Sequence, residues 1–391
     1  MNKLTFMNDK KELQDNILSW CPNPENGALQ QAINIAQHPW LIGNVCLMPD
    51  THEGYGMPIG GVVALDNAIC PNMVGVDIGC QMSAVRTDLT ELSIDNLKKI
   101  MGIIRQLVPV GFNHQKEKQD RDVFNSPLWQ STAVCLREYE SAKKQIGTLG
   151  GGNHFIEIQK GNDGYIWFMI HCGSRNLGYK VAQTYNGMAQ TLCLRWKQDK
   201  IVKDQLAIFP LTDRYFSAYL DELKVCLLFA SANHDLIIEN IKKAFTDTIN
   251  CSFSQTIHTI HNYVDIEHHY DKNVWVHRKG AVRAREGDLC IVPGSQGTAS
   301  YICEGLNNEA SLTSCSHGSG RVMSRTKAKN ELNLEEEQRK LDEKGILHSI
   351  RNKSDLEEAS SAYKDIEEVI KNESDLIKPI IKLEPLGVIK G

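Results

Sequence analysis

The chain has 391 residues, of which 41% are hydrophobic and 23% charged, a composition that excludes a disordered chain and predicts a soluble globular protein. The formal net charge of −5 gives no overall attraction to nucleic acid, so a polyanionic partner would need a local basic patch. Twelve cysteines without a C-x-x-C pair argue against a disulfide framework and a four-cysteine zinc module. No apolar run reaches a membrane span, and residues 1–9 lack a signal-peptide pattern, so we expect a cytoplasmic protein.

A glycine-rich passage at residues 44–66 is the first candidate for a functional loop. Four glycines among short apolar runs predict a strand, a tight loop and a second strand. Asp50 and His52 lie at the tip of this passage. Turn chemistry explains both residues equally well, so their role stays open at this point.

Residues 74–81 predict a short buried strand that ends at glycines, where a backbone can approach a ligand closely. Asp77 and Cys80 lie at that end. Burying either side chain as an anion is costly unless a cation compensates for it, so the pair indicates a divalent metal ion. The alternative is a helix cap followed by an inert buried thiol.

Two more predicted strands each carry a histidine beside a glycine-rich loop. Three glycines at residues 150–152 precede a strand that begins near His154, and an apolar strand at residues 167–170 ends at His171. The backbone amides of a glycine run can converge on an anion. A buried core imidazole explains either histidine alone, but two in the same setting favour a site.

Helical patterns cover residues up to 37, residues 89–107 with a start signal at Ser93, and most of residues 179–250. Residues 253–264 are also predicted to be helical. His258 and His261 would then share one face, which suits metal ligation, although such pairs also occur on solvated helix faces.

Residues 273–293 predict two strands with a run of cations between them. The cations are Arg278, Lys279, Arg283 and Arg285. This run is a candidate for the local basic patch that could hold a phosphodiester backbone. A solvated turn is the alternative.

Two loops near the C-terminus carry groups suited to phosphate chemistry. Residues 293–301 form an amide- and hydroxyl-rich loop. In residues 314–325, glycine and small residues leave the ring of His317 accessible, and Arg321 and Arg325 can neutralise an anion. A nucleophilic imidazole has these requirements.

The rest of the chain predicts exposed charged helices at residues 327–343 and 354–375, and an apolar, packed terminus at residues 383–391. No repeat and no flexible linker is visible. We therefore expect one domain over residues 1–391, with a largely helical portion at about 179–250.

Together these stretches resemble the RtcB family of RNA ligases. The matching blocks run from the N-terminal fifth to the last residue, and as a set they are more specific than any one loop. They are residues 48–61, 75–80, 150–157, 171–178, 261–262, 276–280, 293–301, 317–325, 362–365 and 390–391. The resemblance implies a mixed α+β fold in which helices flank central β-sheets around a dinuclear metal site.

The implied activity is GTP- and Mn²⁺-dependent ligation of an RNA 3′-phosphate or 2′,3′-cyclic phosphate to a 5′-hydroxyl, with GMP carried on His317. The implied ligands of two Mn²⁺ ions, with Cys80 as the bridge, are Asp77, Cys80, His154, His171 and His261. The implied GTP pocket is Asn153, His154, Phe155, Ile156, Glu157, His261, Asn262, Pro293, Gly294, Ser295, Gln296, Ser300, His317, Gly318, Ser319, Gly320 and Lys390. A monomer that binds RNA and GTP, and no membrane, is expected.

Some residues depart from the family pattern. Gln296 stands in place of Met and Ser319 in place of Ala, and the chain is shorter than most relatives. No implied metal ligand is lost, and His317 is present. The resemblance is closer to a bacterial branch found beside a peptide-chain release factor homologue, which implies RNA repair. Asp50 matches a family position near the same centre, with its role open.

Two alternatives share this pattern. One is a catalytically silent RNA-binding protein of the same fold, against which the intact ligand set argues. The other is a metal-dependent phosphodiesterase that opens cyclic phosphates and needs neither His317 nor Lys390. The metal itself is not fixed by ligand softness, because imidazole and thiolate also suit Zn²⁺, Co²⁺ or Ni²⁺.

Overall fold

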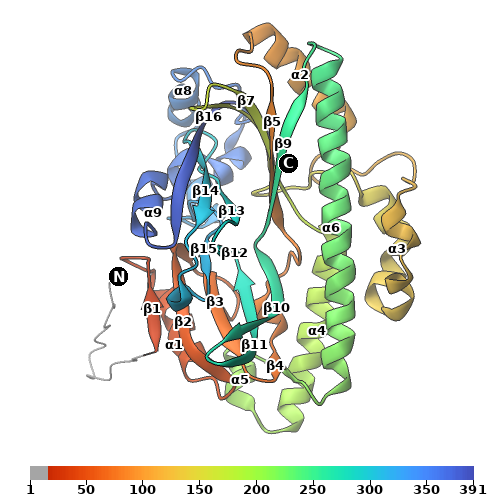
Figure 1. Cartoon of the computed structure of the whole chain (residues 1–391), viewed down its shortest axis with the longest axis vertical. Coiled ribbons are helices and arrows are strands. Elements are labelled where there is room, and N and C mark those ends of the chain that lie inside the picture. The colour runs from red at the N-terminus through yellow and green to blue at the C-terminus, as the bar shows by residue number, and fades with distance from the viewer. Residues whose placement is uncertain (1–15) are drawn as a thin grey trace.

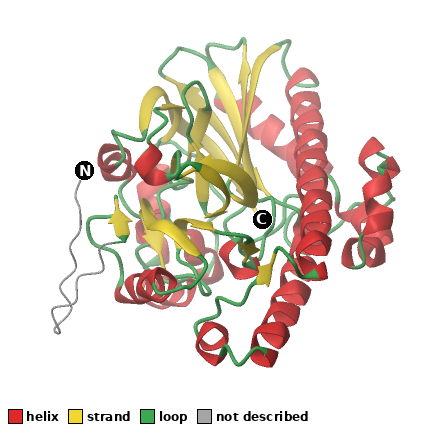
Figure 2. Cartoon of the chain, turned by 60° about the horizontal axis from the view of Figure 1, so that its bottom comes forward, coloured by secondary structure: helices red, strands yellow, loops and turns green. Residues whose placement is uncertain are grey.

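Two β-sheets of seven and five strands form the centre of the computed structural model, which describes residues 16–391 (Figure 1). Helices lie on the outside of these sheets, most visibly the long α6 along one side (Figures 1 and 2). The mixed α+β class with helices flanking central sheets is thus confirmed. Within the described residues, no helix combines the length and apolarity that a bilayer span requires.

The seven-stranded sheet is antiparallel throughout, in the order β13-β14-β16-β6-β7-β5-β9. Its strands are β5 (Gln81–Thr87), β6 (Phe155–Gly161), β7 (Ile166–Cys172), β9 (Phe253–Ile260), β13 (Leu289–Val292), β14 (Ser300–Gly305) and β16 (Ile377–Lys390). The C-terminal strand β16 lies inside this sheet, where Lys390 pairs with Phe155. The predicted packing of the terminus is therefore confirmed.

The five-stranded sheet has the order β1-β2-β3-β11-β10 and is antiparallel except for the β1–β2 pair. Its strands are β1 (Ile17–Ser19), β2 (Leu41–His52), β3 (Ile59–Leu65), β10 (Asn262–His269) and β11 (Lys272–Lys279). Two small pairs join β12 (Ala281–Arg283) to β15 (Ser314–Ser316) and β4 (Ala68–Ile69) to β8 (Phe209–Pro210). The predicted strand, loop and strand at residues 44–66 and the strands at 273–293 are confirmed.

Nine α-helices lie in the described residues, most of them where helical periodicity predicts one, whereas α3 lies where none was predicted. They are α1 (Asn26–Ala36), α2 (Ile94–Leu107), α3 (Val134–Gln145), α4 (Arg175–Arg195), α5 (Asp199–Lys203), α6 (Arg214–Thr246), α7 (Arg325–Glu331), α8 (Leu334–Asp342) and α9 (Ile366–Asn372). The side chain of Ser93 caps α2, as its start signal predicts, by accepting a hydrogen bond from the backbone N–H of Asn96. The largely helical portion at 179–250 is confirmed by α4, α5 and α6.

Short 3₁₀ helices connect several of these elements. They are η1 (Pro71–Met73), η2 (Asp122–Asn125), η3 (Pro127–Ser131), η4 (Glu309–Ser311), η5 (Lys353–Glu358) and η6 (Ser360–Ala362). The segment at 354–375 is therefore helical only in short pieces, and its prediction holds in part.

Two predictions of secondary structure are wrong. Residues 253–264 form β9 and β10 in place of a helix, because β-branched residues such as Thr256, Ile257 and Thr259 fit a strand that pairs with β5. Residues 74–80 are turns instead of a strand. Gly75 and Gly79 have φ of +99° and +75°, which interrupts an extended backbone before β5 begins at Gln81.

The domain prediction is untested and stays a prediction. The signal-peptide argument concerns residues 1–9, and the first part of the predicted helical lead-in also precedes residue 16. Both lie outside the described residues. From residue 16 to 37, the chain forms β1 and α1.

Candidate functional site

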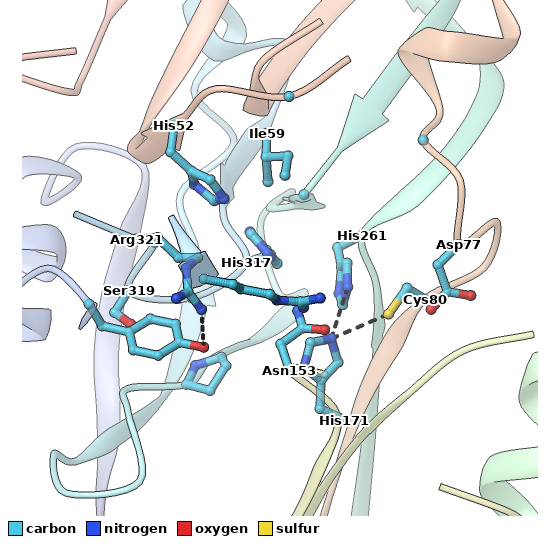
Figure 3. A pocket seen from close by; sticks show the side chains of 18 of the residues that line it. His52, Ile59, Asp77, Cys80, Asn153, His171, His261, His317, Ser319 and Arg321 are labelled. Atoms are coloured by element: carbon cyan, nitrogen blue, oxygen red, sulfur yellow. Dashed lines mark hydrogen bonds between the residues drawn. The ribbon is translucent and has the colours of Figure 1, made fainter. Parts of the chain in front are cut away.

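A cavity of about 680 Å³ opens at one end of the seven-stranded sheet (Figure 3). Adjacent strands are antiparallel there, in the order β6, β7, β5 and β9. The starts of β6 and β5 and the ends of β7 and β9 therefore meet at one edge. His154 precedes β6, His171 lies near the end of β7, Cys80 precedes β5 and His261 follows β9. Strand order brings these four residues together.

The side chains at this edge converge on one point (Figure 3). Cys80 Sγ lies 3.3 Å from His171 Nε2 and 3.6 Å from His154 Nε2. His171 Nε2 lies 3.3 Å from His261 Nε2. Asp77 Oδ2 lies 3.1 Å from His154 Nε2. Among residues 16–391, the ligand atoms of Cys80, His154 and His171 form a buried group within 4.8 Å of one another.

This donor set fits a metal ion. His154 Nδ1 donates to the carbonyl of Leu149 at 3.0 Å, which orients the ring with Nε2 directed at the cluster. Asp77 Oδ1 and His261 Nδ1 are buried polar atoms without a hydrogen-bond partner in the described structure. A centre of imidazole nitrogens, one sulfur and one carboxylate suits a transition metal better than Mg²⁺ or Ca²⁺.

Burial dominates the electrostatics of the cluster. It lowers the pKa of His171 and of His261 well below the usual value, which keeps both imidazoles neutral and able to donate a lone pair. Burial also raises the pKa of the Cys80 thiol, and the Asp77 carboxylate adds to that effect. Burial opposes ionisation of Asp77 too, but its hydrogen bond with His154 holds the pKa of this carboxyl below the usual value.

His317 forms the second functional feature of the cavity. Its Nδ1 donates to Asp50 Oδ2 at 2.6 Å, and its backbone N–H donates to the same oxygen at 3.2 Å. The His261 and His317 ring centroids are 4.8 Å apart, so His317 lies directly beside the donor cluster. Because Asp50 holds the proton on Nδ1, Nε2 retains its lone pair, as a nucleophilic imidazole requires.

The fold supports Asp50 from two sides. Lys364 Nζ donates to the carbonyls of Pro49 and Thr51, at 2.9 and 2.6 Å, and so fixes the strand on both sides of Asp50. A Cβ on Gly320 would lie 2.2 Å from the Asp50 carbonyl oxygen, and Gly320 has φ +71°. Only glycine fits there, so the His317 loop closes tightly over Asp50.

Most of the predicted nucleotide residues line the cavity. Those that do are Asn153, Phe155, Glu157, His261, Asn262, Pro293, Gly294, Ser295, Gln296, His317, Gly318, Ser319, Gly320 and Lys390. His154 belongs to the donor cluster. Ile156 packs in an apolar core, and buried Ser300 accepts a hydrogen bond from the Gly294 N–H at 3.2 Å, so these two lie outside the cavity lining. Burial raises the pKa of Glu157 to about 8.

The predicted basic patch is wrong. Arg278 is fully buried, where it forms an ion pair with Glu267 and donates to Ser314 Oγ at 2.9 Å. Buried Lys279 donates to the carbonyls of Tyr55 and Asn72, and burial lowers its pKa to about 7. The remaining two cations, Arg283 and Arg285, pair with Asp288 and Glu267. Two of the four cations are thus buried at the end of β11, and the two exposed ones are held in ion pairs.

Arg278→Ala is expected to lower the free energy of unfolding by about 3–5 kcal/mol, because it leaves the Glu267 carboxylate buried without its partner. Chemical denaturation at neutral pH measures the loss. Arg283→Ala is the matched control, since this half-exposed pair with Asp288 should contribute less than about 1 kcal/mol. Equal stability of the two variants would contradict this account of Arg278.

Several residues at the cavity were not among the predicted site residues. They include His52, Tyr55 and Tyr363, which line the cavity, and Glu358, which contacts the lining residues. Buried Glu358 accepts from Lys390 Nζ at 3.3 Å, Arg321 Nη1 at 3.3 Å and the Tyr363 hydroxyl. Tyr363 lies in a block that matched the family, which was a usable signal. Glu358 lies in a charged segment with no local signal.

Comparison with known proteins gives a consistent result. The family model described as tRNA-splicing ligase RtcB matches residues 31–391. The chain is 36% identical to the RNA-splicing ligase RtcB of Escherichia coli over 94% of this chain and 95% of that protein. It is 32% identical to the tRNA-splicing ligase RtcB of Nanoarchaeum equitans over 94% of this chain and 92% of that one. The chain therefore belongs to the RtcB family.

Proposed function

We propose that the protein is a GTP- and Mn²⁺-dependent RNA ligase that joins a 3′-phosphate or 2′,3′-cyclic phosphate end to a 5′-hydroxyl end. The observation that carries the proposal is the His317–Asp50 pair, with 2.6 Å between Nδ1 and Oδ2, directly beside a buried donor cluster. A metal-dependent hydrolase needs no such oriented imidazole. The names of the relatives, RNA-splicing and tRNA-splicing ligase, support the same activity.

In the proposed first step, neutral His317 attacks the α-phosphorus of GTP through Nε2. A bond forms between Nε2 and phosphorus, the bond from that phosphorus to its bridging oxygen breaks, and pyrophosphate leaves. The imidazole gains positive charge as the bond forms. The Asp50 carboxylate, which accepts the Nδ1 hydrogen bond, offsets that charge.

The following steps transfer GMP and seal the RNA. An oxygen of the RNA 3′-phosphate attacks the phosphorus of the His317 adduct, which restores neutral His317 and leaves GMP on the RNA end. The 5′-hydroxyl oxygen of the second RNA end then attacks the 3′-phosphorus, GMP departs, and the hydroxyl proton is released. A 2′,3′-cyclic phosphate must first be opened by water to give the 3′-phosphate.

Asp77, Cys80, His154, His171 and His261 are the residues that would hold two Mn²⁺ ions, with Cys80 shared. Bound divalent ions would polarise the phosphates and offset their negative charge. We assign Mn²⁺ by family resemblance, because the donor set alone also accepts Zn²⁺, Co²⁺ or Ni²⁺. We also propose a monomeric, cytoplasmic protein with a role in RNA repair.

The test of the function is incubation of the purified protein with α-³²P-labelled GTP and Mn²⁺. We expect label to stay with the denatured protein, and the bond to be labile in acid and stable in alkali, as a phosphoramidate is. RNA with a 3′-phosphate should then remove the label. No covalent label with any divalent metal would exclude the ligase. Hydrolysis of a cyclic phosphate without label would favour the phosphodiesterase alternative, and RNA binding alone would favour a silent binding protein.

Removal of Lys390 and Gly391 is expected to slow His317 guanylylation by on the order of 100-fold, because a charged hydrogen-bond donor to the nucleotide is lost. Lys390 Nζ lies 5.3 Å from the Phe155 ring centroid and 3.3 Å from Glu358 Oε2, inside the cavity lining. The rate of label incorporation at limiting GTP measures the effect.

Lys390→Met is the matched variant, since it keeps the strand pairing with Phe155 and loses only the charge. Metal content and opening of a cyclic phosphate should be normal in both variants. If both form the His317 adduct at the wild-type rate, the terminus is structural and Lys390 leaves the proposed site.

A further inference from the structure

Phe112 has the highest exposure of any large apolar side chain in the described part of the chain. Single exposed apolar residues are ordinary on protein surfaces, so exposure alone assigns no role. The loop that presents this ring, residues 110–116, is hydrogen-bonded to the segment that leads into the cavity. The position of the loop is therefore what suggests a role for the exposed ring.

Hydrogen bonds fix this loop at three points, two on the backbone of Gly111 and one on the side chain of Gln115. The Gly111 N–H donates to the Gly150 carbonyl at 2.7 Å. Arg175 Nη2 donates to the Gly111 carbonyl at 3.1 Å, while its Nε donates to Thr148 Oγ1 at 3.0 Å. Gln115 Nε2 donates to the Gly147 carbonyl at 3.0 Å. The Phe112 ring therefore projects into solvent from an anchored backbone.

Two anchors belong to the segment that precedes His154, and the third, Arg175 on α4, is hydrogen-bonded to Thr148 of that segment. Gly147, Thr148 and Gly150 precede His154, whose Nδ1 lies 2.9 Å from the position of a Cβ on Gly150. Exposed Asn153, three residues after Gly150, lines the cavity. The exposed ring thus lies on a loop bonded directly to the edge of the cavity.

Cations lie close to the ring. His114 and Lys116 are exposed on the same loop and lie nearer to Phe112 in sequence than the exposed Glu117 and Asp120. Arg175 lies beneath the loop. Single-stranded nucleic acid is bound by this combination of an aromatic face for a base and nearby cations for phosphates.

We propose that Phe112 stacks on an unpaired base of the RNA, close to the end that enters the cavity. The inference rests on the proposed function in one respect, that RNA is the substrate. It does not depend on guanylylation of His317. The aromatic face would hold the strand and set a preference for an unpaired nucleotide near the reacting end, which makes Phe112 a positioning residue.

Binding of RNA with hydroxyl groups at both ends, without GTP, tests the proposal in the full chain. Phe112→Ala and Phe112→Leu are expected to weaken binding roughly tenfold, because both lose the aromatic face, whereas Phe112→Trp should bind as well as wild type. The dependence of affinity on salt should be unchanged, since stacking releases no counterions. Trp196→Ala is the control. This half-exposed aromatic ends α4 about 30 Å from Arg175 and should have no effect.

A scan of abasic nucleotides along the RNA locates the contact. With the wild-type protein, removing the base at one position near an RNA end should weaken binding roughly tenfold. With Phe112→Ala, removing the same base should weaken binding no further. Wild-type affinity in Phe112→Ala and Phe112→Leu, or equal abasic penalties in both proteins, would overturn the proposal and direct the search to a protein partner for this loop. If wild type fails to bind RNA at all, the proposed function fails instead.

Discussion

His317→Ala is expected to abolish covalent GMP transfer and RNA sealing, with a loss of at least about 10³-fold, while the bound metal and the affinity for RNA stay unchanged. The physical reason is that this imidazole is the proposed nucleophile, and it lies outside the donor cluster with its Nδ1 hydrogen-bonded to Asp50. Labelled GTP measures the adduct, and metal analysis and RNA binding measure the two retained properties. A labelled His317→Ala protein would move the nucleophile to another residue.

Asp50→Asn is the matched variant for this prediction, because it keeps the shape of the side chain and removes its charge. The amide can turn its NH₂ group toward the imidazole, which moves the ring proton to Nε2 and blocks attack. Adduct formation should slow by on the order of 10³–10⁴-fold, with His317 still present. ¹⁵N NMR of the labelled imidazole separates positioning from a structural effect. We expect the proton on Nδ1 in wild type and on Nε2 in Asp50→Asn.

Cys80→Ala is expected to lose both proposed metal ions and all activity, because the proposed bridging thiolate would contribute a ligand to each ion. The affinity for the metal should fall at least about 100-fold, which is more than the loss of a residue that only hydrogen-bonds to a metal ligand would cause. Equilibrium dialysis followed by metal analysis measures the stoichiometry. In the Co²⁺-loaded protein, the thiolate-to-metal charge-transfer absorption should disappear, which is a readout independent of activity.

Two histidine variants serve as comparisons for Cys80→Ala, one with an expected partial loss of metal and one with no expected loss. His154→Ala should retain one ion in part, since only one ion loses a ligand. His258→Ala should keep both ions, because His258 lies on β9 with its Nδ1 2.8 Å from Ser83 Oγ and takes no part in the donor cluster. A Cys80→Ala protein that still holds two equivalents of Mn²⁺ would exclude the bridging role.

The sequence by itself determined which chemically active residue types the candidate site contains. His317 between glycine and small residues, and Asp77 three residues before Cys80, are recognisable because their environment is set by adjacent residues. The strands after the glycine run and before His171 were also predictable, since alternation and apolar runs are local properties. The resemblance to the RtcB family rested on the same short blocks, and the family match supports it.

Only the tertiary structure decided which of these residues meet. His261 was expected on a helix, but β9 pairs with β5, and this pairing brings His261 to the same edge as Cys80. Local propensity cannot predict this strand pairing, because the pairing joins residues more than 170 positions apart in sequence, such as Ser83 and His258. The contact of Asp50 with His317 spans 267 positions and has no local signature.

The fate of the four cations at residues 278–285 shows the same limit. Their sequence reads as a basic surface patch, because charge is a local property and burial is not. Arg278 is buried only because β11 lies between β3 and β10, where Glu267 on β10 supplies its counter-charge. Residue type therefore specified the chemistry that this chain can perform, whereas strand order and register, which are set by long-range packing, decided which side chains reach the cavity and which stabilise the core.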